Sequence, residues 1–482
     1  MIGIHTVERI RTAEQEFARS HPGANLMLQA ASAIARRAEA MAPTGTILVV
    51  AGPGDNGGDG LFAARGLALA GRHVIVWLTA GKGHPGGVVA ARQVGIRFLD
   101  AVTVLRLLPE MSLVVDAVTG VGGRAGLPGG LSQFAEACRM LAIPVLSVDL
   151  PSGLSADSHE RPRHFFQARQ TVTFSAPKLC QLAQPAASCC GDLEIVDLGL
   201  ELPESELNQM ETVDVARWWP WPSTYSDKYS RGALGVDTGS QRYPGAAVLS
   251  VSGALYSGVG ILRFIGPPRP AEAVLYAQPS VTMGPGRVQA WLAGCGWGPE
   301  ASVERLDPIL NSGLPAVIDA EALAHLPAEL PEGWLMTPHA GELARMMGVA
   351  RDDVVADPLG HARQAAASWK TTVLLKGATQ YVAEPSGRVT LAIPGPAWTA
   401  QAGSCDVLAG ICGTLIAAGL PAWQAGALGA SVQALAAVKR SGPFPPEEVA
   451  QALPLVLDEL GRLVSSQGIL AVDLTPSSIA FS

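Results

Sequence analysis

The chain has 482 residues, 48% of them hydrophobic and 16% charged, with a formal net charge of −8. This composition is that of a folded protein, and the length exceeds what one hydrophobic core usually supports, so two or three domains are expected. The acidic balance argues against nonspecific nucleic-acid binding, which needs a basic surface, and we expect no nucleic-acid partner.

The cysteines and the apolar segments indicate in which cellular compartment the protein is expected. None of the seven cysteines forms a C-x-x-C pair, so neither a zinc site nor a disulfide framework is indicated. The N-terminal stretch is charged from residue 7 onward and has no apolar signal region. The apolar stretch 407–420 is too short and too rich in glycine to span a bilayer. We therefore expect a cytoplasmic protein with reduced thiols and no membrane partner.

The first part of the chain alternates strand-like and helical segments. Residues 24–41 predict an amphipathic helix. The apolar runs that follow are nearly continuous in Val, Ile and Leu, which suits parallel strands covered on both faces. These runs are 46–52, 73–80, 112–118, 143–150 and 170–176. We predict a Rossmann-like, doubly wound α/β domain over residues 1–210.

A change of composition separates this domain from a second one. Residues 200–225 gather acidic residues, Trp and Pro without periodicity, and we interpret 211–224 as a linker. The second domain, 225–482, is again predicted to be α/β, with a long Ala- and Gly-rich helical stretch at 406–439. Its apolar runs are 232–239, 260–266, 290–296, 315–320, 333–339 and 371–377.

The stretch "ILVVAGPGDNGGDG" contains the spacing G-x-G-x-x-G at Gly52, Gly54 and Gly57. A dehydrogenase-type cofactor site also needs an acidic residue at the end of the second strand, and "HVIVWLTAG" offers none. Two carboxylates, Asp55 and Asp59, would repel a pyrophosphate in such a cradle. A tight strand-to-helix turn explains the glycines alone, whereas the oxygen-bearing side chains favour a hard cation or a hydroxyl-rich ligand.

Other predicted strands end in similar groups. Asp116 ends the run "SLVVDAV", and Asp149 and Ser152 follow the run "IPVLSV". Ligands bind at the carboxyl ends of parallel strands, so these loops are expected to meet the glycine-rich loop. A single aspartate at a strand end is more often a turn or helix cap, but three polar loops in one domain favour a site.

Four spaced segments of the first half carry a family resemblance. They are "GPGDNGGDGLFAARGLALAG", "VVDAVTGVGG", "VDLPSGLSAD" and "TVTFSAPK". In this order they resemble the NAD(P)HX epimerase family, the YjeF N-terminal domain, over about residues 1–210. That family interconverts the R and S epimers of hydrated NADH and NADPH and binds potassium. One departure is Asp55, which stands where the family usually has Asn.

The resemblance implies roles for particular residues of the first domain. Potassium would be held by Asn56, Asp116 and Ser152, and Asp149 would act as acid and base at C6 of the hydrate. Lys178 in "SAPK" is a second basic candidate, although a surface salt bridge explains it equally well. Substrate contacts are implied for Asp55, Asn56, Gly57, Gly58, Asp59, Gly120, Val121, Gly122, Gly123, Arg124, Ala125, Gly126 and Asp149.

In the second half, "AGSCDVLAG" places Asp406 at the start of an apolar helix. A helix N-terminus binds anions, and an adjacent aspartate can take a proton from a hydroxyl, although an Asp N-cap is also common. With "TPHAGELARMMG" and "VLLKGATQYV", the stretch resembles the ADP- or ATP-dependent NAD(P)H-hydrate dehydratase family over about residues 225–482. That family has a ribokinase-like fold, phosphorylates the hydrate hydroxyl and then eliminates phosphate, with Mg²⁺ shielding the phosphates.

This second resemblance implies a further set of site residues. Asp406 matches the catalytic Asp. Contacts to the hydrate are implied for Ala247, Gly298, His339 and Asp406. Contacts to ADP or ATP are implied for Lys376, Gly377, Ala378, Thr379, Gln380 and Cys405. Cys405 stands where the family has a glycine, and its Cβ is costly if the backbone there needs a positive φ.

Three hypotheses follow. The first is a bifunctional repair enzyme for hydrated NADH and NADPH, acting on small molecules and assembled, like its relatives, as a homo-oligomer. The second keeps the epimerase and treats the C-terminal half as a weak or inactive nucleotide-binding domain. The third is a ribokinase-type small-molecule kinase fused to a regulatory domain, which "TPHAGE" and the whole first domain disfavour.

Overall fold

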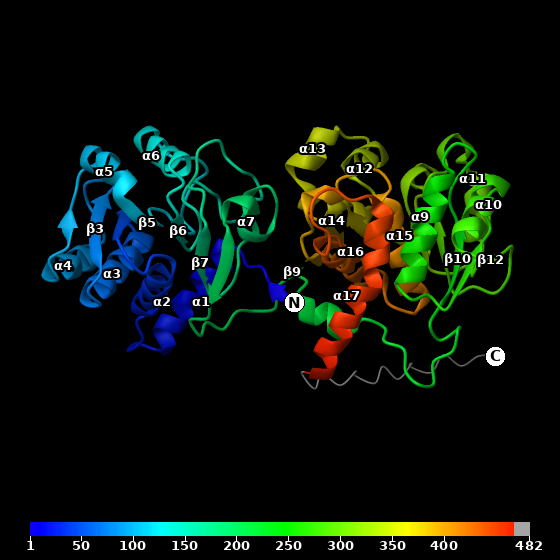
Figure 1. The fold of residues 1–482 in the computed structure, drawn as a ribbon, viewed down its shortest axis with the longest axis horizontal. Coiled ribbons are helices and arrows are strands. Elements are labelled where there is room, and N and C mark those ends of the chain that lie inside the picture. The colour runs from blue at the N-terminus through cyan, green and yellow to red at the C-terminus, as the bar shows by residue number, and fades with distance from the viewer. Residues whose placement is uncertain (467–482) are drawn as a thin grey trace. The chain divides into compact units, whose positions relative to one another are not determined.

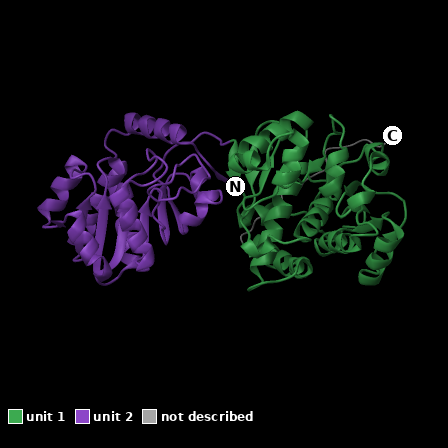
Figure 2. Cartoon of the chain, turned by 90° about the horizontal axis from the view of Figure 1, so that it is seen from above, with its two compact units in different colours: residues 1, 206–482 green, residues 2–205 purple. Residues whose placement is uncertain are grey.

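The structure is a computed structural model in which residues 1–466 are described. It divides into two compact units, one of residues 2–205 and one that begins at residue 206 and also includes Met1 (Figure 2). The last sixteen positions of the predicted second domain, 467–482, lie outside the described residues. Within the described part of the chain, no helix has both the length and the apolar character needed to cross a membrane.

The N-terminal unit is built on a seven-stranded sheet with the order β4-β3-β2-β5-β6-β7-β8, and all of its neighbouring strands are parallel. Its strands are β1 (Ile2–Gly3), which lies outside this sheet, β2 (Thr46–Ala51), β3 (His73–Leu78), β4 (Arg97–Phe98), β5 (Met111–Ala117), β6 (Val145–Val148), β7 (Gln170–Phe174) and β8 (Asp192–Val196). Its α-helices are α1 (Val7–Ser20), α2 (Leu26–Met41), α3 (Asp55–Leu69), α4 (Pro85–Gln93), α5 (Ala101–Leu107), α6 (Gly129–Met140) and α7 (Leu179–Leu182).

Helices cover both faces of this sheet (Figure 1). Ile47 and Val49 of β2 pack in one cluster with α2, α3 and α4, whereas Leu48 and Val50 pack in another with α5 and α6. Successive residues of a strand point to opposite faces, so each central strand must be apolar throughout. This explains why the strands appear as continuous apolar runs, and it confirms the doubly wound fold.

The C-terminal unit contains a sheet with the order β9-β18-β17-β16-β15-β14-β13-β10-β11-β12. The strands from β10 to β16 pair in parallel, and β17 and β18 form an antiparallel hairpin at one side. The strands are β9 (Leu207–Gln209), β10 (Ala233–Asp237), β11 (Ile261–Phe264), β12 (Thr282–Met283), β13 (Ala290–Ala293), β14 (Ala316–Ile318), β15 (Leu335–Met336), β16 (Thr372–Leu375), β17 (Tyr381–Ala383) and β18 (Val389–Leu391).

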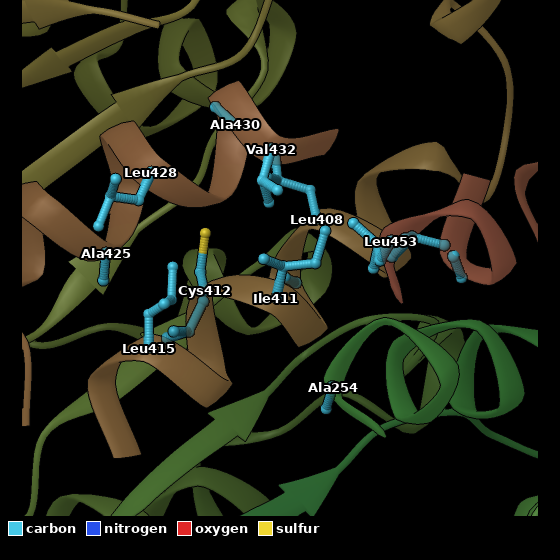
Figure 3. Close-up of a cluster of buried hydrophobic side chains, with 14 of the residues drawn as sticks. Ala254, Leu408, Ile411, Cys412, Leu415, Ala425, Leu428, Ala430, Val432 and Leu453 are labelled. Carbon is cyan, nitrogen blue, oxygen red and sulfur yellow. The ribbon is translucent and has the colours of Figure 1, made fainter. Parts of the chain in front are cut away.

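The α-helices of this unit are α8 (Thr212–Trp218), α9 (Pro244–Tyr256), α10 (Pro268–Ala277), α11 (Val303–Leu310), α12 (Ala340–Met347), α13 (Arg351–Ala356), α14 (Pro358–Trp369), α15 (Ser404–Ala417), α16 (Ala422–Val438) and α17 (Pro446–Ser466). The stretch 406–439, expected as one long helix, is therefore two. Gly419 has φ +93°, and Pro421 precedes α16, so the helix cannot continue through this turn. Figure 3 shows apolar side chains of α15 and α16 gathered in the core between them.

The boundary between the units differs from the expected one. The C-terminal unit begins at residue 206 rather than after 210, because β9 pairs with β18. The segment 211–224 is not an open linker, because it contains α8, whose Val215 and Ala216 are fully buried. Trp219 is buried as well, and the Trp221 indole donates a hydrogen bond to the Ala216 carbonyl at 2.8 Å. The aperiodic aromatic residues thus anchor a short helix to the core.

Candidate active sites

The glycine-rich loop of the N-terminal unit turns the chain sharply from β2 into α3. A Cβ placed on Gly57 would lie 2.0 Å from the Gly52 carbonyl oxygen, and a Cβ placed on Gly52 would lie 2.0 Å from that of Val118. These two positions therefore need glycine for close backbone approach, as the tight-turn interpretation held. Asp55 and Asn56 occupy the first turn of α3, where backbone N–H groups are free of helical partners.

A cavity of about 430 Å³ opens at the carboxyl ends of β2, β5, β6 and β7. Its lining includes the predicted residues Asp55, Asn56, Asp59, Gly120, Val121, Gly122, Gly123 and Asp149. Five other predicted contacts do not line it: Gly57 and Gly58 are buried in α3, and Arg124, Ala125 and Gly126 lie exposed farther along their loop. Because β2 lies between β3 and β5, this edge is where the strand order reverses, the usual place for a ligand in such a sheet.

Asp149 is held in place by a dense set of contacts. Its φ of +67° is left-handed, which is uncommon for an aspartate and turns the chain sharply after β6. Its Oδ1 accepts hydrogen bonds from Lys178 Nζ at 2.6 Å and from Thr173 Oγ1 at 3.2 Å, and its Oδ2 accepts one from the Val121 N–H at 2.9 Å. The Gln181 side chain donates to its backbone carbonyl at 2.6 Å.

Lys178 is a buried ion-pair partner, not a surface residue. Only 1% of it is exposed, and its ammonium group also donates to Thr173 Oγ1 at 2.7 Å. A charge taken out of water is tolerated only when it is paired and hydrogen-bonded, and both conditions hold here. The sequence is equally compatible with Lys178 as a basic residue of the site and with a surface salt bridge. The structure excludes the surface salt bridge.

Two further carboxyl groups of the cavity lie on elements far apart in the sequence. Burial, together with the neighbouring charges of Asp149, Asp55 and Glu14, raises the pKa of Asp59 to about 8. Burial, followed by the charge of Asp149, also raises the pKa of Glu14 on α1. The sequence had no signal for α1 at this site, although Ile10, Arg11 and Glu14 all line the cavity. With its pKa near 8, Asp59 can hold a proton at neutral pH.

Asp116 and Ser152 form a buried pair beside the cavity. The Ser152 hydroxyl donates to Asp116 Oδ1 at 2.6 Å, and the Ser152 N–H donates to Oδ2 at 2.8 Å. Burial raises the pKa of Asp116 to about 6, while the hydrogen bonds from Ser152 and Ser147 oppose the shift. In the adjoining loops Asn56 Nδ2 and Thr119 Oγ1 are buried without a hydrogen-bond partner. The carboxylate and hydroxyl oxygens gathered here, with the Thr119 hydroxyl unsatisfied, fit a hard cation, whereas the Asn56 N–H group is free to donate to a ligand.

In the C-terminal unit, charged residues again gather at strand ends. Asp319 follows β14, and Lys376 follows β16. Lys376 Nζ lies 2.5 Å from Asp319 Oδ1, and both side chains are buried. The charge of Asp319 raises the pKa of Lys376 although burial acts in the opposite direction. Lys376 therefore neutralises Asp319 inside the protein, whereas Gly377 and Ala378, the next residues of the predicted nucleotide loop, are exposed.

Asp406 lies in the first turn of α15, as predicted, but it has no lysine partner of its own. Burial raises its pKa to about 7, and the nearby charge of Asp319 adds to the shift. A carboxyl group with this pKa is suited to accepting a proton near neutral pH. Ligand atoms of Cys295, Asp319 and Asp406 all lie within 4.8 Å of one another.

The backbone before Asp406 shows that Cys405 does not occupy a position that needs a positive φ. The left-handed residue is Gly403, with φ +90°, and a Cβ there would lie 2.6 Å from Leu249 Cδ1. Cys405 lies inside the helix and is not among the residues with positive φ. The position that requires glycine is thus occupied by glycine, and the thiol adds no backbone strain.

Three predicted substrate contacts have structural roles. His339 is the N-cap of α12: its Nδ1 accepts the N–H groups of Gly341 at 3.0 Å and Glu342 at 3.2 Å. Ala247 is fully buried in the core and offers no surface to a ligand. Gly298 has φ +53°, and a Cβ there would lie 2.7 Å from the Tyr243 ring. Sequence reasoning missed Cys295, which no motif marked.

Comparisons with known proteins match each half of the chain to the family that its motifs resemble. Residues 23–180 match the family model described as YjeF-related protein N-terminus, and residues 234–450 match the model described as NAD(P)H-hydrate dehydratase. A bifunctional NAD(P)H-hydrate repair enzyme of Mycobacterium tuberculosis is 37% identical over 444 residues, covering 88% of this chain and 91% of that one. The enzyme of the same name from Mycobacterium leprae is 36% identical over 468 residues, covering 92% and 95%.

Among solved structures, a ribokinase-like superfamily protein of Enterococcus faecalis aligns with a TM-score of 0.50 and 20% identity, covering 54% of this chain and 99% of that one. This likeness shows the fold of the C-terminal unit. The fold and the two strand-end sites define a two-domain α/β enzyme with a Rossmann-like unit and a ribokinase-like unit. The relatives place it further: the chain belongs to the family of bifunctional NAD(P)H-hydrate repair enzymes. It carries both an epimerase and a dehydratase domain, which confirms the bifunctional repair enzyme of the first hypothesis.

Proposed function

We propose that Asp149 is the acid and base of the epimerase and that Lys178 positions it. The observation that carries this is the buried ion pair on the cavity wall, which holds one Asp149 oxygen while the carboxylate still faces the cavity. In the hydrate, C6 bears both a hydroxyl group and the ring nitrogen. Asp149 takes the hydroxyl proton as the C6–N bond opens to an aldehyde and the bonding electron pair passes to the ring nitrogen. The nitrogen then attacks the other face of the carbonyl, and Asp149 returns the proton to the oxygen.

The substrate would enter between the glycine-rich loop and the Gly120–Gly123 loop, whose backbones admit close approach. We further propose that Asn56, Asp116 and Ser152 hold potassium, as their oxygens and the unsatisfied Thr119 hydroxyl beside them support. The ion would supply fixed positive charge among several carboxylates. Asp55, where relatives have Asn, would add negative charge at this position.

For the dehydratase we propose that Asp406 takes the proton of the hydrate hydroxyl as that oxygen attacks the terminal phosphoryl group of ADP or ATP. Its first-turn position on α15 places it beside N–H groups that can receive the transferred phosphoryl. The loop Gly377–Gln380, whose first two residues are exposed, would contact the nucleotide, with Lys376 keeping Asp319 neutralised behind it. Mg²⁺ would supply charge that shields the phosphates. Elimination of phosphate then restores the nicotinamide ring.

The decisive experiment incubates purified full-length protein with mixed epimers of hydrated NADH and follows absorbance at the NADH band. Parallel samples contain ADP, ATP or no nucleotide, each with and without Mg²⁺. Complete conversion with a nucleotide requires both activities, because the dehydratase consumes one epimer only. Conversion of half the substrate means an inactive epimerase. If absorbance does not recover although the protein is folded, the dehydratase proposal fails and the hypothesis of a degenerate C-terminal domain gains support.

The potassium proposal has its own test. Epimer exchange is measured in buffers with potassium or with a bulky organic cation only, using Asn56→Ala and the wild type. Potassium is expected to accelerate the wild type and to have a much weaker effect on Asn56→Ala. Equal wild-type rates in the two buffers would contradict the potassium proposal.

We also propose a cytoplasmic homo-oligomer, in keeping with seven free cysteines, and light scattering of the purified protein measures its mass.

A further inference from the structure

A cluster of mixed ligands lies beside the proposed dehydratase base. Cys295 Sγ and carboxylate oxygens of Asp319 and Asp406 lie within 4.8 Å of one another. Cys295 and Asp319 are buried, and Asp406 is partly exposed, so the cluster has a dry side and an open side. The three residues come from the ends of β13 and β14 and from the first turn of α15, and only the fold brings them together.

The oxygens and the sulfur are arranged so that a cation could join them. Lys376 occupies Oδ1 of Asp319, whereas Oδ2 faces Cys295 Sγ at 3.7 Å. Zn²⁺ binds thiolate sulfur at about 2.3 Å and carboxylate oxygen at about 2.0 Å, which in a tetrahedral site separates the two ligand atoms by about 3.5 Å. The observed separation of 3.7 Å is therefore close to the one that a zinc ion requires.

Charge also favours a divalent cation here. A Cys295 thiolate and two carboxylates carry three negative charges, and the Lys376 ammonium compensates one of them. The remaining two match one M²⁺ ion, which leaves the buried cluster neutral. Magnesium prefers oxygen ligands and retains its waters, whereas a thiolate selects zinc and similar thiophilic ions.

We propose that Cys295, Asp319 and Asp406 form an inhibitory binding site for Zn²⁺ or a similar thiophilic divalent cation. Binding forms the metal–sulfur bond, and the thiol proton leaves to solvent. Three protein ligands leave a fourth position on the open side for water or a phosphate oxygen. With its carboxylate coordinated, Asp406 no longer accepts the hydroxyl proton, so the ion stops dehydration. This last consequence rests on the proposed role of Asp406, whereas the binding itself does not.

Cobalt tests the binding directly, because a Co²⁺–thiolate bond gives a charge-transfer absorption that Mg²⁺ and free Co²⁺ lack. Metal-free full-length protein is titrated with Co²⁺ and then with Zn²⁺. We expect a charge-transfer band that saturates at one equivalent and disappears when Zn²⁺ replaces Co²⁺. The band should be lost in Cys295→Ser and retained in Cys405→Ser, a matched control beside the same aspartate. No band, a band in Cys295→Ser, or its loss in Cys405→Ser would overturn the proposal.

Asp406→Asn gives a second measurement that does not depend on Cys295→Ser folding. Its charge-transfer band should persist, but with a Co²⁺ affinity lower by at least about tenfold, because one ligand has lost its charge. An unchanged affinity would contradict the ligand set. For inhibition, Zn²⁺ should suppress dehydration in the wild type at least about tenfold more effectively than in Cys295→Ser, each normalised to its own metal-free rate. Equal inhibition of both would remove the inhibitory role while leaving the binding result intact.

Discussion

Both halves of the chain contain a buried lysine paired with an aspartate at the end of parallel strands, but the two lysines pair with different members of the proposed sites. In the N-terminal unit Lys178 pairs with Asp149, the proposed acid and base itself. In the C-terminal unit Lys376 pairs with Asp319 and leaves Asp406 without a lysine partner.

The two units differ in which of their carboxyl groups have a raised pKa. Burial and the charge of Asp319 raise the pKa of Asp406 to about 7, although the nearby Lys376 opposes the shift. In the N-terminal unit the raised pKa values belong instead to Asp59, at about 8, and to Glu14, which surround the paired Asp149. Asp406 and Asp59, neither of which has a lysine partner, are thus the carboxyl groups that can carry a proton near neutral pH.

The largest expected effect comes from Asp406→Asn, which separates the two halves. Dehydration should fall by about 10²- to 10⁴-fold, the usual contribution of a general base, because an amide cannot take the hydroxyl proton. Epimer exchange should not change, since that site lies in the other unit. The rates are measured in one sample by absorbance and by chromatography of the epimers. Asp307→Asn, on the exposed surface of α11, is the matched control. An active Asp406→Asn enzyme would contradict the comparison.

Next in size is Lys178→Met, which leaves Asp149 buried and unpaired. Loss of one partner of a buried ion pair costs about 3–5 kcal/mol, so the N-terminal unit should be strongly destabilised. Hydrogen exchange of peptides from β6 and β7 should accelerate, while exchange in α15 and β16 should stay as in the wild type. Lys82→Met replaces an exposed lysine of the same unit and should have no such effect. Unchanged exchange in β6 would mean that the pair does not hold the site.

A third prediction concerns pH and belongs to the C-terminal unit alone. Because the folded pKa of Asp406 is about 7, its base form is lost as pH falls through 7. Below that value kcat/KM for dehydration should decrease by about tenfold per pH unit, and above it the rate should level off. Initial rates across this range, with folding checked by circular dichroism, measure the profile. A flat profile would show that Asp406 is ionised throughout this range and would contradict its raised pKa.

The smallest expected effect tests the entrance to α15. Cys405→Gly should lower the free energy of unfolding by about 0.5–1 kcal/mol, because glycine in a regular helix loses more backbone entropy. Gly403→Ala should cost more, about 1–3 kcal/mol, since φ +90° is strained for alanine and Leu249 leaves no room for its Cβ. Thermal unfolding of both variants measures the two losses of stability. If Cys405→Gly were the more destabilised, the assignment of the left-handed position would be wrong.

Much of the fold follows from local sequence, because its signals are local. Buried parallel strands need apolar residues on both faces, so each long apolar run became a strand of the doubly wound or ribokinase-like sheet. The boundary at residue 206 and the break at Gly419–Pro421 were missed for different reasons. Trp218 and Trp219 resemble an irregular linker until a core covers them, whereas Gly419 and Pro421 are a local stop signal that the helical prediction for 406–439 passed over.

The sequence by itself determined the family, the strand ends that carry polar groups, and the candidates Asp149 and Asp406, since motifs and spacing are readable along the chain. Only the tertiary structure decided which charges meet. It paired Lys178 with Asp149 and Lys376 with Asp319, turned His339 into a helix cap, and brought Cys295 beside both Asp319 and Asp406. Burial and ion pairing depend on residues far apart in sequence, so their effects on pKa and metal affinity exist only in the folded chain.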